Sequence, residues 1–306
     1  MGAARTILIV LLLIILIRIY KYRSMAYKRV NRLFRSPPSN LPNTYTLDRF
    51  SPPTIEPNYS QTIPTIICQT VASRSLPLDL YETCMINRHM NPEYEYRIYE
   101  NSEFEAFARE HYSEEHADAF QKLIPGAFKS DLMRCLLLYK FGGVYIDCKA
   151  STMIPLREML KPDTKMMAFV DYTPNCIHNG FIASEPGHPL LKRVIDRILH
   201  NVATQFYGEC QLDITGPMVW GREFNIMRGK DQRLEFEHGH YPEIGIDLAG
   251  TYLTFDKHEI LMSKEMVPYV NRVVPGYYSV KKLLHPDHYA VRWYTKRVYK
   301  NNHTLL

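Results

Sequence analysis

The 306-residue sequence predicts an α/β domain with a mainly parallel sheet covered by helices, preceded by a single N-terminal transmembrane helix. From Ile63 onward, apolar runs of strand length alternate with segments of helical periodicity, as in parallel α/β sheets. Near the N-terminus, one uncharged apolar run is flanked by basic residues. An apolar content of 46% suffices for a large core, which excludes a wholly disordered chain.

The apolar run extends from Thr6 to Ile17, with Arg5 before it and Arg18 after it. As a helix it would cover about 18 Å, less than the roughly 30 Å of a bilayer core, unless Arg18 snorkels and the next two residues join the span. We predict an uncleaved membrane anchor over residues 1–23. A cleaved signal peptide and a surface-lying or buried segment are the alternatives.

Basic charge is concentrated in the first 35 residues, which hold eight Lys or Arg and no Asp or Glu. The rest of the chain has 29 basic and 32 acidic residues, so we expect no nucleic-acid partner. Residues 24–60 are predicted to form a stem, because the stretch from Ser36 to Pro57 holds six prolines and few large apolar residues. The folded domain is then expected over residues 61–306.

Within that domain "TIICQT" and "YRIYE" predict strands, and "SEFEAFAREHY" predicts a helix with a capping box of Ser102 and Glu105. Ser113 opens a second helix. A third is expected from Pro125 to the stop at Gly142. Further strands are expected at "GVYID", "MMAFV" and "NGFIAS", and a further helix at about residues 188–200.

The third helix and the strand after it suggest a site. Asp131 and Arg134 are three residues apart and share a helix face. From Arg134 to Gly142 the helix rises about 12 Å, and the strand ending at Asp147 returns about 13 Å. The three polar groups would then converge at the carboxyl end of a strand, where open α/β sheets bind ligands. The alternative is an ordinary surface pair and a turn-capping Asp.

The segment "KSDLMRCLLLYKFGGVYIDCKA" resembles the DxD-type glycosyltransferase sugar-binding-region family. This family is related to the yeast initiating α-1,6-mannosyltransferases and more distantly to the glucosylating toxins, with a nucleotide-sugar fold like that of capsular polysaccharide synthesis proteins and these toxins. The resemblance extends over most of residues 63–295, through "IPTIICQT", "NPEYEYRIYE", "NGFIASEPGHP", "TGP" and "DHYAVRWY". It implies a Rossmann-like nucleotide-diphospho-sugar transferase domain. The matching positions of the central motif are Ser130, Asp131, Arg134, Tyr139, Gly142, Gly143, Tyr145 and Asp147.

The resemblance also implies roles for individual residues. Asp131 and Arg134 would hold hydroxyls of the donor sugar, and Asp147, the first Asp of the DxD signature, would lie near the ribose or sugar. Other positions implied on the donor or nucleotide side are Gln69, Thr70, Tyr145 and Trp293. Asn179 and Gly180 would border the sugar and acceptor side. His288 and Trp293 would close over the diphosphate.

Lys149 departs from the family pattern, because the second, metal-binding Asp is expected there and this sequence reads "DCK". Departure of a nucleoside diphosphate needs a nearby cation, which an ammonium can supply as well as Mn²⁺ or Mg²⁺. An ammonium would also repel an incoming metal. Three alternatives stay open: a metal-independent transferase using Lys149, a metal held by Asp147 with a residue such as His288, and a weak or inactive relative.

We therefore expect a glycosyltransferase that moves a sugar from a nucleoside-diphosphate donor to a glycan or glycoprotein, with retention of configuration. The alternative is a non-catalytic nucleotide-sugar- or glycan-binding protein that kept the fold. The resemblance favours a single-pass membrane protein of the secretory pathway, in the Golgi or endoplasmic reticulum. The basic flank after the anchor favours a cytosolic-facing domain instead, and this conflict stays open.

Three other features carry less weight. His238 and His240 in "EHGHYPE" lack a third metal ligand at suitable spacing, which indicates a polar loop. Six scattered cysteines form no CxxC pair and do not specify a disulfide pattern. The basic stretch "RWYTKRVYK" is typical of a solvated helix face; contact with anionic membrane lipid is the alternative.

Overall fold

The computed structural model describes residues 42, 44–171, 173, 175–250, 252–255, 258–262, 268–273 and 287–300. The predicted anchor, residues 1–23, and the first part of the predicted stem lie outside these residues. In the ranges given above, no helix is both long enough and apolar enough to cross a bilayer.

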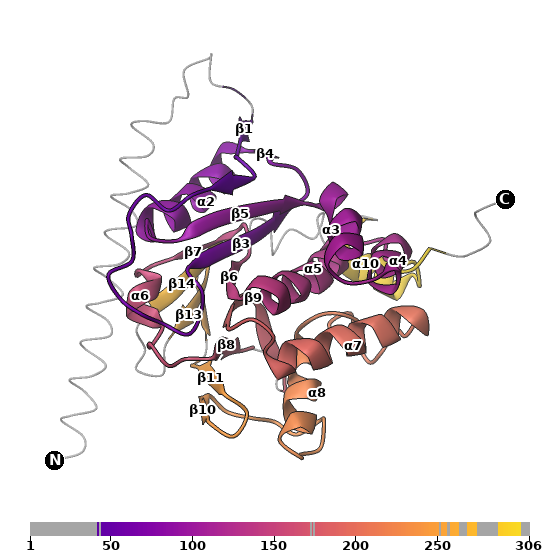
Figure 1. The fold of residues 1–306 in the computed structure, drawn as a ribbon. Coiled ribbons are helices and arrows are strands. Elements are labelled where there is room, and N and C mark those ends of the chain that lie inside the picture. Colours follow the sequence, from indigo (N-terminus) through magenta and orange to yellow (C-terminus); the bar gives the residue numbers. More distant parts are fainter. Residues whose placement is uncertain are drawn as a thin grey trace. The chain divides into compact units, whose positions relative to one another are not determined.

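Eight strands form one mixed sheet (Figure 1). β3 lies parallel to both of its neighbours, β5 and β6, and β11 lies parallel to β8. Across the sheet the strands are β10 (Gly239–Tyr241), β11 (Ile246–Ala249), β8 (Met166–Val170), β9 (Ile177–Ser184), β6 (Gly143–Ile146), β3 (Ile66–Val71), β5 (Glu95–Glu100) and β2 (Phe50–Ser51).

The α/β class is confirmed, but the prediction of a mainly parallel sheet is wrong. β9 runs antiparallel to both β6 and β8, and the two outermost pairings are antiparallel as well. Only residues 171–176 separate β8 from β9. So short a connection cannot make the helical crossover that parallel strands need, and the chain turns back antiparallel.

Both faces of the sheet are buried. On β6, Val144 and Ile146 pack into one core, and Tyr145 between them packs into the other. Helices α5 (Gly126–Phe141), α7 (Pro189–Ala203) and α8 (Pro217–Met227) contribute to the core on the Tyr145 side. Helices α2 (Leu78–Met90) and α6 (Leu156–Met159) contribute to the other. Burial on two faces explains why the strands read as continuous apolar runs.

A second, four-stranded sheet packs on the α2 side and follows the order β12 (Tyr252–Phe255), β13 (His258–Met262), β14 (Pro268–Val273) and β7 (Ala150–Thr152). Because β6 ends at Ile146 and β7 begins at Ala150, the short turn at 147–149 connects the two sheets. The remaining elements are β1 (Tyr45–Thr46), which pairs with β4 (Ser75–Leu76), a 3₁₀ helix (Asn101–Glu103), α3 (Phe104–His111), α4 (Glu114–Lys122) and α10 (Tyr289–Tyr294).

The predicted elements recur with small shifts, and one detail is wrong. The capping box is formed by Glu100 and Glu103, whose carboxylate accepts the Glu100 backbone N–H at 2.7 Å, and not by Ser102 and Glu105. The cause is the 3₁₀ turn, which starts the helical segment before Ser102. Part of the predicted stem pairs with the folded domain, because β1 and β2 lie within residues 24–60.

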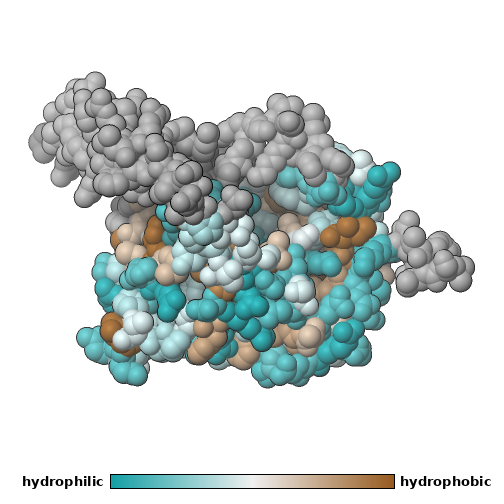
Figure 2. Space-filling view, turned by 90° about the horizontal axis from the view of Figure 1, so that it is seen from above, coloured by the Kyte–Doolittle hydropathy of each residue, from teal (hydrophilic) through white to brown (hydrophobic). Residues whose placement is uncertain are grey.

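The surface carries no single large apolar patch among the described residues in the view of Figure 2, where hydrophobic side chains gather in small separate areas of a largely hydrophilic face. Scattered exposed apolar residues of this kind are normal for folded proteins.

All six cysteines are free thiols in the structure.

Candidate functional site

The candidate site is built by the direct passage from α5 into β6. Two glycines make this passage, with φ of 65° at Gly142 and 92° at Gly143, where side chains are rarely tolerated. A Cβ on Gly143 would lie 2.4 Å from the backbone oxygen of Ile66. The glycines therefore let β6 run beside β3 and back along α5, which brings Asp147 level with the first turns of the helix.

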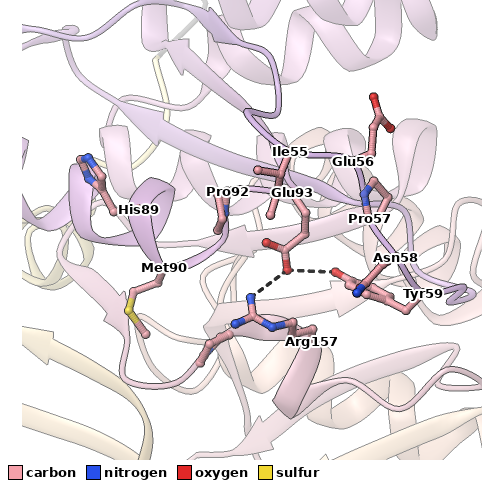
Figure 3. Close-up of a pocket in the computed structure, with 11 residues that line it drawn as sticks. Ile55, Glu56, Pro57, Asn58, Tyr59, His89, Met90, Pro92, Glu93 and Arg157 are labelled. Atoms are coloured by element: carbon pink, nitrogen blue, oxygen red, sulfur yellow. Dashed lines mark hydrogen bonds and ion pairs between the residues drawn. The ribbon is translucent and has the colours of Figure 1, made fainter.

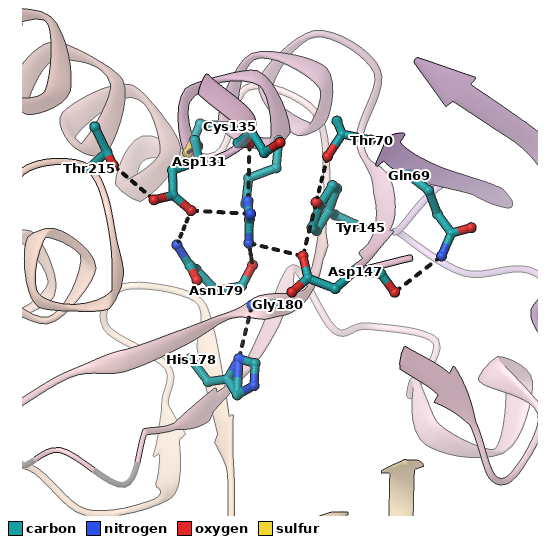
Figure 4. Close-up of polar contacts among 12 residues, drawn as sticks. Gln69, Thr70, Asp131, Cys135, Tyr145, Asp147, His178, Asn179, Gly180 and Thr215 are labelled. Carbon is teal, nitrogen blue, oxygen red and sulfur yellow. Dashed lines mark hydrogen bonds and ion pairs between the residues drawn. The ribbon is translucent and has the colours of Figure 1, made fainter. Parts of the chain in front are cut away.

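The guanidinium of Arg134 lies between two carboxylates (Figure 4). Its nitrogens are 3.1 Å from Asp131 Oδ1 and 3.5 Å from Asp147 Oδ1, and its centre lies 4.5 Å from the centroid of the Tyr145 ring. Arg134 also donates to the backbone oxygens of Ser130 and Asn179. The helix and the returning strand thus bring Asp131, Arg134 and Asp147 together as their spacing predicts.

Asp131 is held by groups from two other parts of the chain. Thr215 donates its hydroxyl to Oδ2 at 2.8 Å, and the Asn179 amide donates to Oδ1 at 2.9 Å. Burial raises the pKa of the Asp131 carboxyl to about 6, against the opposing charge of Arg134 and the Thr215 hydrogen bond. Asp131 is therefore ionised at neutral pH and begins to protonate in mildly acidic solution.

Asp147 is tied to the ends of two neighbouring strands. The Tyr145 hydroxyl donates to Asp147 Oδ1 at 3.1 Å and lies 2.8 Å from the hydroxyl of Thr70. The Gln69 amide donates to the Asp147 backbone oxygen at 3.3 Å. Gln69, Thr70 and Tyr145, three of the four residues expected on the nucleotide side, thus share one hydrogen-bonded network with Asp147 at the carboxyl ends of β3 and β6.

His178 and Gly180 lie on the other side of Asp147. A Cβ on Gly180 would be 3.0 Å from Asp147 Oδ2 and 2.6 Å from His178 Cε1, so only glycine leaves both side chains in place. The Gly180 backbone N–H donates to His178 Nδ1 at 2.9 Å, which leaves the other ring nitrogen as the proton carrier in neutral imidazole. Sequence analysis missed His178 and Thr215, although each is next to or within a family-like segment.

Lys149 lies in the tight turn that follows Asp147. The Ala150 N–H donates to the Asp147 oxygen at 2.8 Å, which closes the turn with Cys148 and Lys149 at its tip. The Lys149 side chain is half-buried, and it makes no ion pair or hydrogen bond with the described part of the chain.

The groups around Asp147 fit a divalent metal poorly. Within the described residues no three His, Cys, Asp or Glu side chains form a metal-binding group, and the turn offers an ammonium where a second carboxylate is needed. His288 caps α10 by accepting the Ala290 N–H at 3.3 Å and stacks on Tyr289. Trp293 donates to the Tyr207 backbone oxygen at 2.6 Å. Both predicted diphosphate-closing residues thus help to fix α10.

A pocket of about 470 Å³ lies elsewhere, where the chain passes from α2 into β5 (Figure 3). Its buried carboxylate, Glu93, accepts from the Tyr59 hydroxyl at 3.1 Å and from Arg157 at 3.2 Å. This is the amino end of β5, whereas Asp147 follows the carboxyl end of β6. None of the residues implied by the family resemblance lines this pocket.

Comparison with known proteins identifies the region that holds Asp131 and Asp147. Residues 79–167 match the family model for the "Glycosyltransferase sugar-binding region containing DXD motif". The chain is 27% identical over 141 residues to mannosyl phosphorylinositol ceramide synthase CSH1 of Saccharomyces cerevisiae, covering 46% of this chain and 36% of that protein. It is 25% identical over 160 residues to inositol phosphoceramide mannosyltransferase 1 of Schizosaccharomyces pombe, covering 51% and 49%.

The aligned segments therefore span between about a third and a half of the length of these relatives. Among solved structures, the glycosyltransferase PaToxG is similar with a TM-score of 0.45 and 17% sequence identity, over 54% of this chain and 69% of that one.

Proposed function

Because residues 79–167 carry the glycosyltransferase sugar-binding region that contains a DXD motif, we propose that this chain is a glycosyltransferase that uses a nucleoside-diphosphate sugar. The sequence-based identification of the family is confirmed over that region. The observation that carries the proposal is the position of Arg134 between Asp131 and Asp147 at the carboxyl ends of β3 and β6. Ligands of α/β sheets bind at this edge.

Each group in the network has a chemical task in this proposal. Asp131 and Asp147 accept hydrogen bonds from donor hydroxyls, and Arg134 donates to the sugar and fixes both carboxylates. Thr215 and Asn179 position Asp131. Tyr145, Thr70 and Gln69 position Asp147 and border the nucleotide. Preorganised groups of this kind need no rearrangement when the glycosidic bond breaks.

Lys149 is proposed to stabilise the leaving nucleoside diphosphate directly. As the bond between the anomeric carbon and the diphosphate oxygen breaks, negative charge collects on the diphosphate, and an ammonium beside it lowers the barrier. The acceptor oxygen replaces the diphosphate on the anomeric carbon, with retention of configuration, and the hydroxyl proton passes to the departing diphosphate. The enzyme would then work without Mn²⁺ or Mg²⁺.

Mannose is the first sugar to consider, because the similar yeast proteins are named as mannosyltransferases of inositol phosphoceramide. We propose a glycan, glycoprotein or glycolipid acceptor. A membrane anchor over residues 1–23 and a location in the secretory pathway, as a Golgi-type enzyme, complete the proposal. In this proposal His288 and Trp293 close over the diphosphate, and Asn179 and Gly180 border the sugar and acceptor.

The test is turnover of a panel of nucleotide sugars by the purified full chain, with GDP-mannose and UDP-glucose included and with or without EDTA. We expect one donor to be transferred or slowly hydrolysed, with activity unchanged by EDTA. Lys149→Ala should lower kcat by about 100-fold, the usual loss when one charge-stabilising group is removed. Lys161→Ala, an exposed lysine elsewhere, is the matched control.

Lys149→Asp should make the residual activity dependent on added Mn²⁺. Loss of wild-type activity in EDTA with recovery in Mn²⁺ would refute the role of the ammonium while leaving the transferase intact. Binding of a donor without turnover under every metal condition would instead support the non-catalytic alternative.

A further inference from the structure

The last described segment of the chain pairs with the end of α4, and this pairing brings two lysines face to face. An antiparallel bridge joins Leu123 to Tyr299, the Ile124 N–H donates to Val298 at 2.9 Å, and the Lys300 N–H donates to Lys122 at 2.9 Å. Leu123, Val298 and Tyr299 are buried. The pairing is therefore anchored in the core, and Lys122 and Lys300 are directly opposite each other on its exposed side.

Like charges that face each other across an antiparallel pair destabilise the fold. A third ammonium adds to them, because Lys129 on the first turns of α5 has its pKa lowered by burial and by the charge of Lys300, with Glu105 offsetting this only in part. Lys300 therefore lies opposite Lys122 across the pairing and repels the ammonium of Lys129. Repulsion of this kind is relieved when an anion binds between them.

The exposed side chains next to these lysines extend the same surface. Lys296 stands over the rings of Tyr207 and Trp293, 4.4 and 5.0 Å from their centroids, and Arg297 is exposed beside it. Tyr294 is 72% exposed, the most exposed large hydrophobic side chain of the described residues. α10 contacts α5 (Figure 1). We call Lys122, Lys129, Lys296, Arg297 and Lys300 the C-terminal basic patch.

Cation–π contacts account for the position of Lys296, but ordinary structural roles do not account for the other members of the patch. Other basic side chains nearby are paired, as Arg292 is with Asp287 at 2.5 Å and Lys192 with Asp196 at 2.6 Å. No member of the patch is in an ion pair with any residue that the structure describes. Attraction of a cation to a helix carboxyl end could explain Lys122, in the last turn of α4, but not Lys129 near the start of α5.

We propose that the C-terminal basic patch, with Tyr294, docks on an anionic phospholipid surface. Exposed lysines and arginines supply the attraction to phosphate head groups, and an exposed tyrosine suits the boundary between head groups and hydrocarbon. A nucleic acid is a poorer partner, because the chain beyond its first 35 residues holds more acidic than basic residues. This inference goes beyond the proposed function and does not depend on it.

The test compares the rates at which lysines of the wild-type full chain are acetylated in the presence of two kinds of vesicle. Mass spectrometry measures the acetylation of each lysine. In vesicles with about 30% phosphatidylserine, acetylation of Lys122, Lys129 and Lys300 should be about fivefold slower than in pure phosphatidylcholine. The exposed lysines Lys161 and Lys230 serve as internal controls and should change by less than about twofold. Salt at about 0.5 M should abolish the protection, because it screens the charges.

Equal acetylation of the patch on both vesicles would overturn the proposal. Protection by inorganic phosphate in solution, without protection by anionic vesicles, would also overturn it and would indicate a site for a soluble anion. As a second measurement, Lys129 should lose its protection from acetylation on anionic vesicles in the double variant Lys122→Glu with Lys300→Glu, whereas it should stay protected in Lys161→Glu with Lys230→Glu, of the same charge. Equal loss in both would contradict docking through the patch.

Discussion

Two clusters in this molecule pair arginine with carboxylate and tyrosine, and they differ in which partner is open to solvent. In the cluster of Arg134, the arginine side chain is 6% exposed and that of Asp147 is 20% exposed. In the cluster of Arg157, the arginine is 41% exposed and the carboxylate of Glu93 is 2% exposed. The first cluster thus buries its cation and presents a carboxylate, and the second does the reverse.

The position of each cluster on the sheet explains this difference. Asp147 follows the carboxyl end of β6, beside the end of β3, and ligands of α/β sheets bind at this edge. Glu93 precedes β5 at its amino end, and its carboxylate satisfies Tyr59 and Arg157. Both hydrogen bonds end on Glu93 Oε1 and fix loops to each other, while Oε2 is buried without a hydrogen-bond partner among the described residues. We infer that only the first cluster serves chemistry.

The strongest contrast is expected from removing one carboxylate charge in each cluster. Asp147→Asn should lower donor turnover by at least about 100-fold, because the side chain that faces the ligand loses its charge. Glu93→Gln should leave kcat within about twofold and should lower thermal stability. Initial rates with the active donor, together with thermal melts, would measure both. A comparable loss of turnover in Glu93→Gln would break the distinction.

Replacing each arginine by lysine should show how much the two clusters contribute to the free energy of unfolding. Arg134→Lys should lower the free energy of unfolding by about 3 kcal/mol, since one ammonium cannot hold two buried carboxylates and two backbone oxygens. Arg157→Lys should cost less than about 1 kcal/mol, because that side chain is largely exposed. Urea denaturation measures both. Similar losses would show that the two clusters are equally structural.

Filling the space beside Asp147 with a methyl group should have a smaller effect on activity. Gly180→Ala places a methyl group 3.0 Å from Asp147 Oδ2 and should lower kcat/KM by about tenfold, because small misplacements of a positioned group are costly. Gly239→Ala is the matched control, since its nearest neighbour would be 3.7 Å away. If both variants keep full activity, the position of Asp147 is not critical.

The smallest effect concerns pH. Donor binding should weaken as the pH falls through about 6, where Asp131 becomes protonated. Thr215→Val removes a hydrogen bond that lowers the Asp131 pKa, so the decline should move to higher pH and affinity at pH 6 should fall by about threefold. Tyr59→Phe in the second cluster should leave the profile unchanged. Calorimetric titrations between pH 5 and 8 would show it.

The free energy of unfolding should also depend on the protonation of Asp131. Its Asp131 component should fall as the pH rises, whereas donor affinity should increase. The raised pKa means that folded Asp131 binds more protons than unfolded Asp131 between about pH 4 and 6. The Asp131 contribution to the free energy of unfolding therefore decreases as the pH rises through this window. An Asp131→Asn variant, which cannot titrate there, should lack this component in urea denaturation at each pH.

The central geometry could be predicted from the sequence because it is local. A helix from residue 126 to residue 141, a two-glycine stop and a four-residue strand fix the distance from Asp131 and Arg134 to Asp147 through the rise per residue alone. The location of Lys149 near Asp147 could be predicted for the same reason, because the two are only two residues apart. The helices and strands around these residues could also be predicted from the sequence, because the periodicity of the apolar residues specifies them.

The remaining parts depend on long-range packing. Thr215 reaches Asp131 across 84 residues, and no periodicity links the two. The order and direction of the strands depend on the short connection before β9, so the mixed sheet was missed. The opposed lysines at residues 122 and 300 come together only through a bridge between distant segments.

Amide hydrogen exchange of the full chain, with and without a saturating nucleotide sugar, tests the central claim most directly. The account predicts slower exchange at residues 145–150, 178–181 and 213–216, around Asp147, Gly180 and Thr215, with no change at residues 89–93 or 155–158. Protection confined to the pocket of Glu93 and Arg157, with none around Asp147, would contradict it.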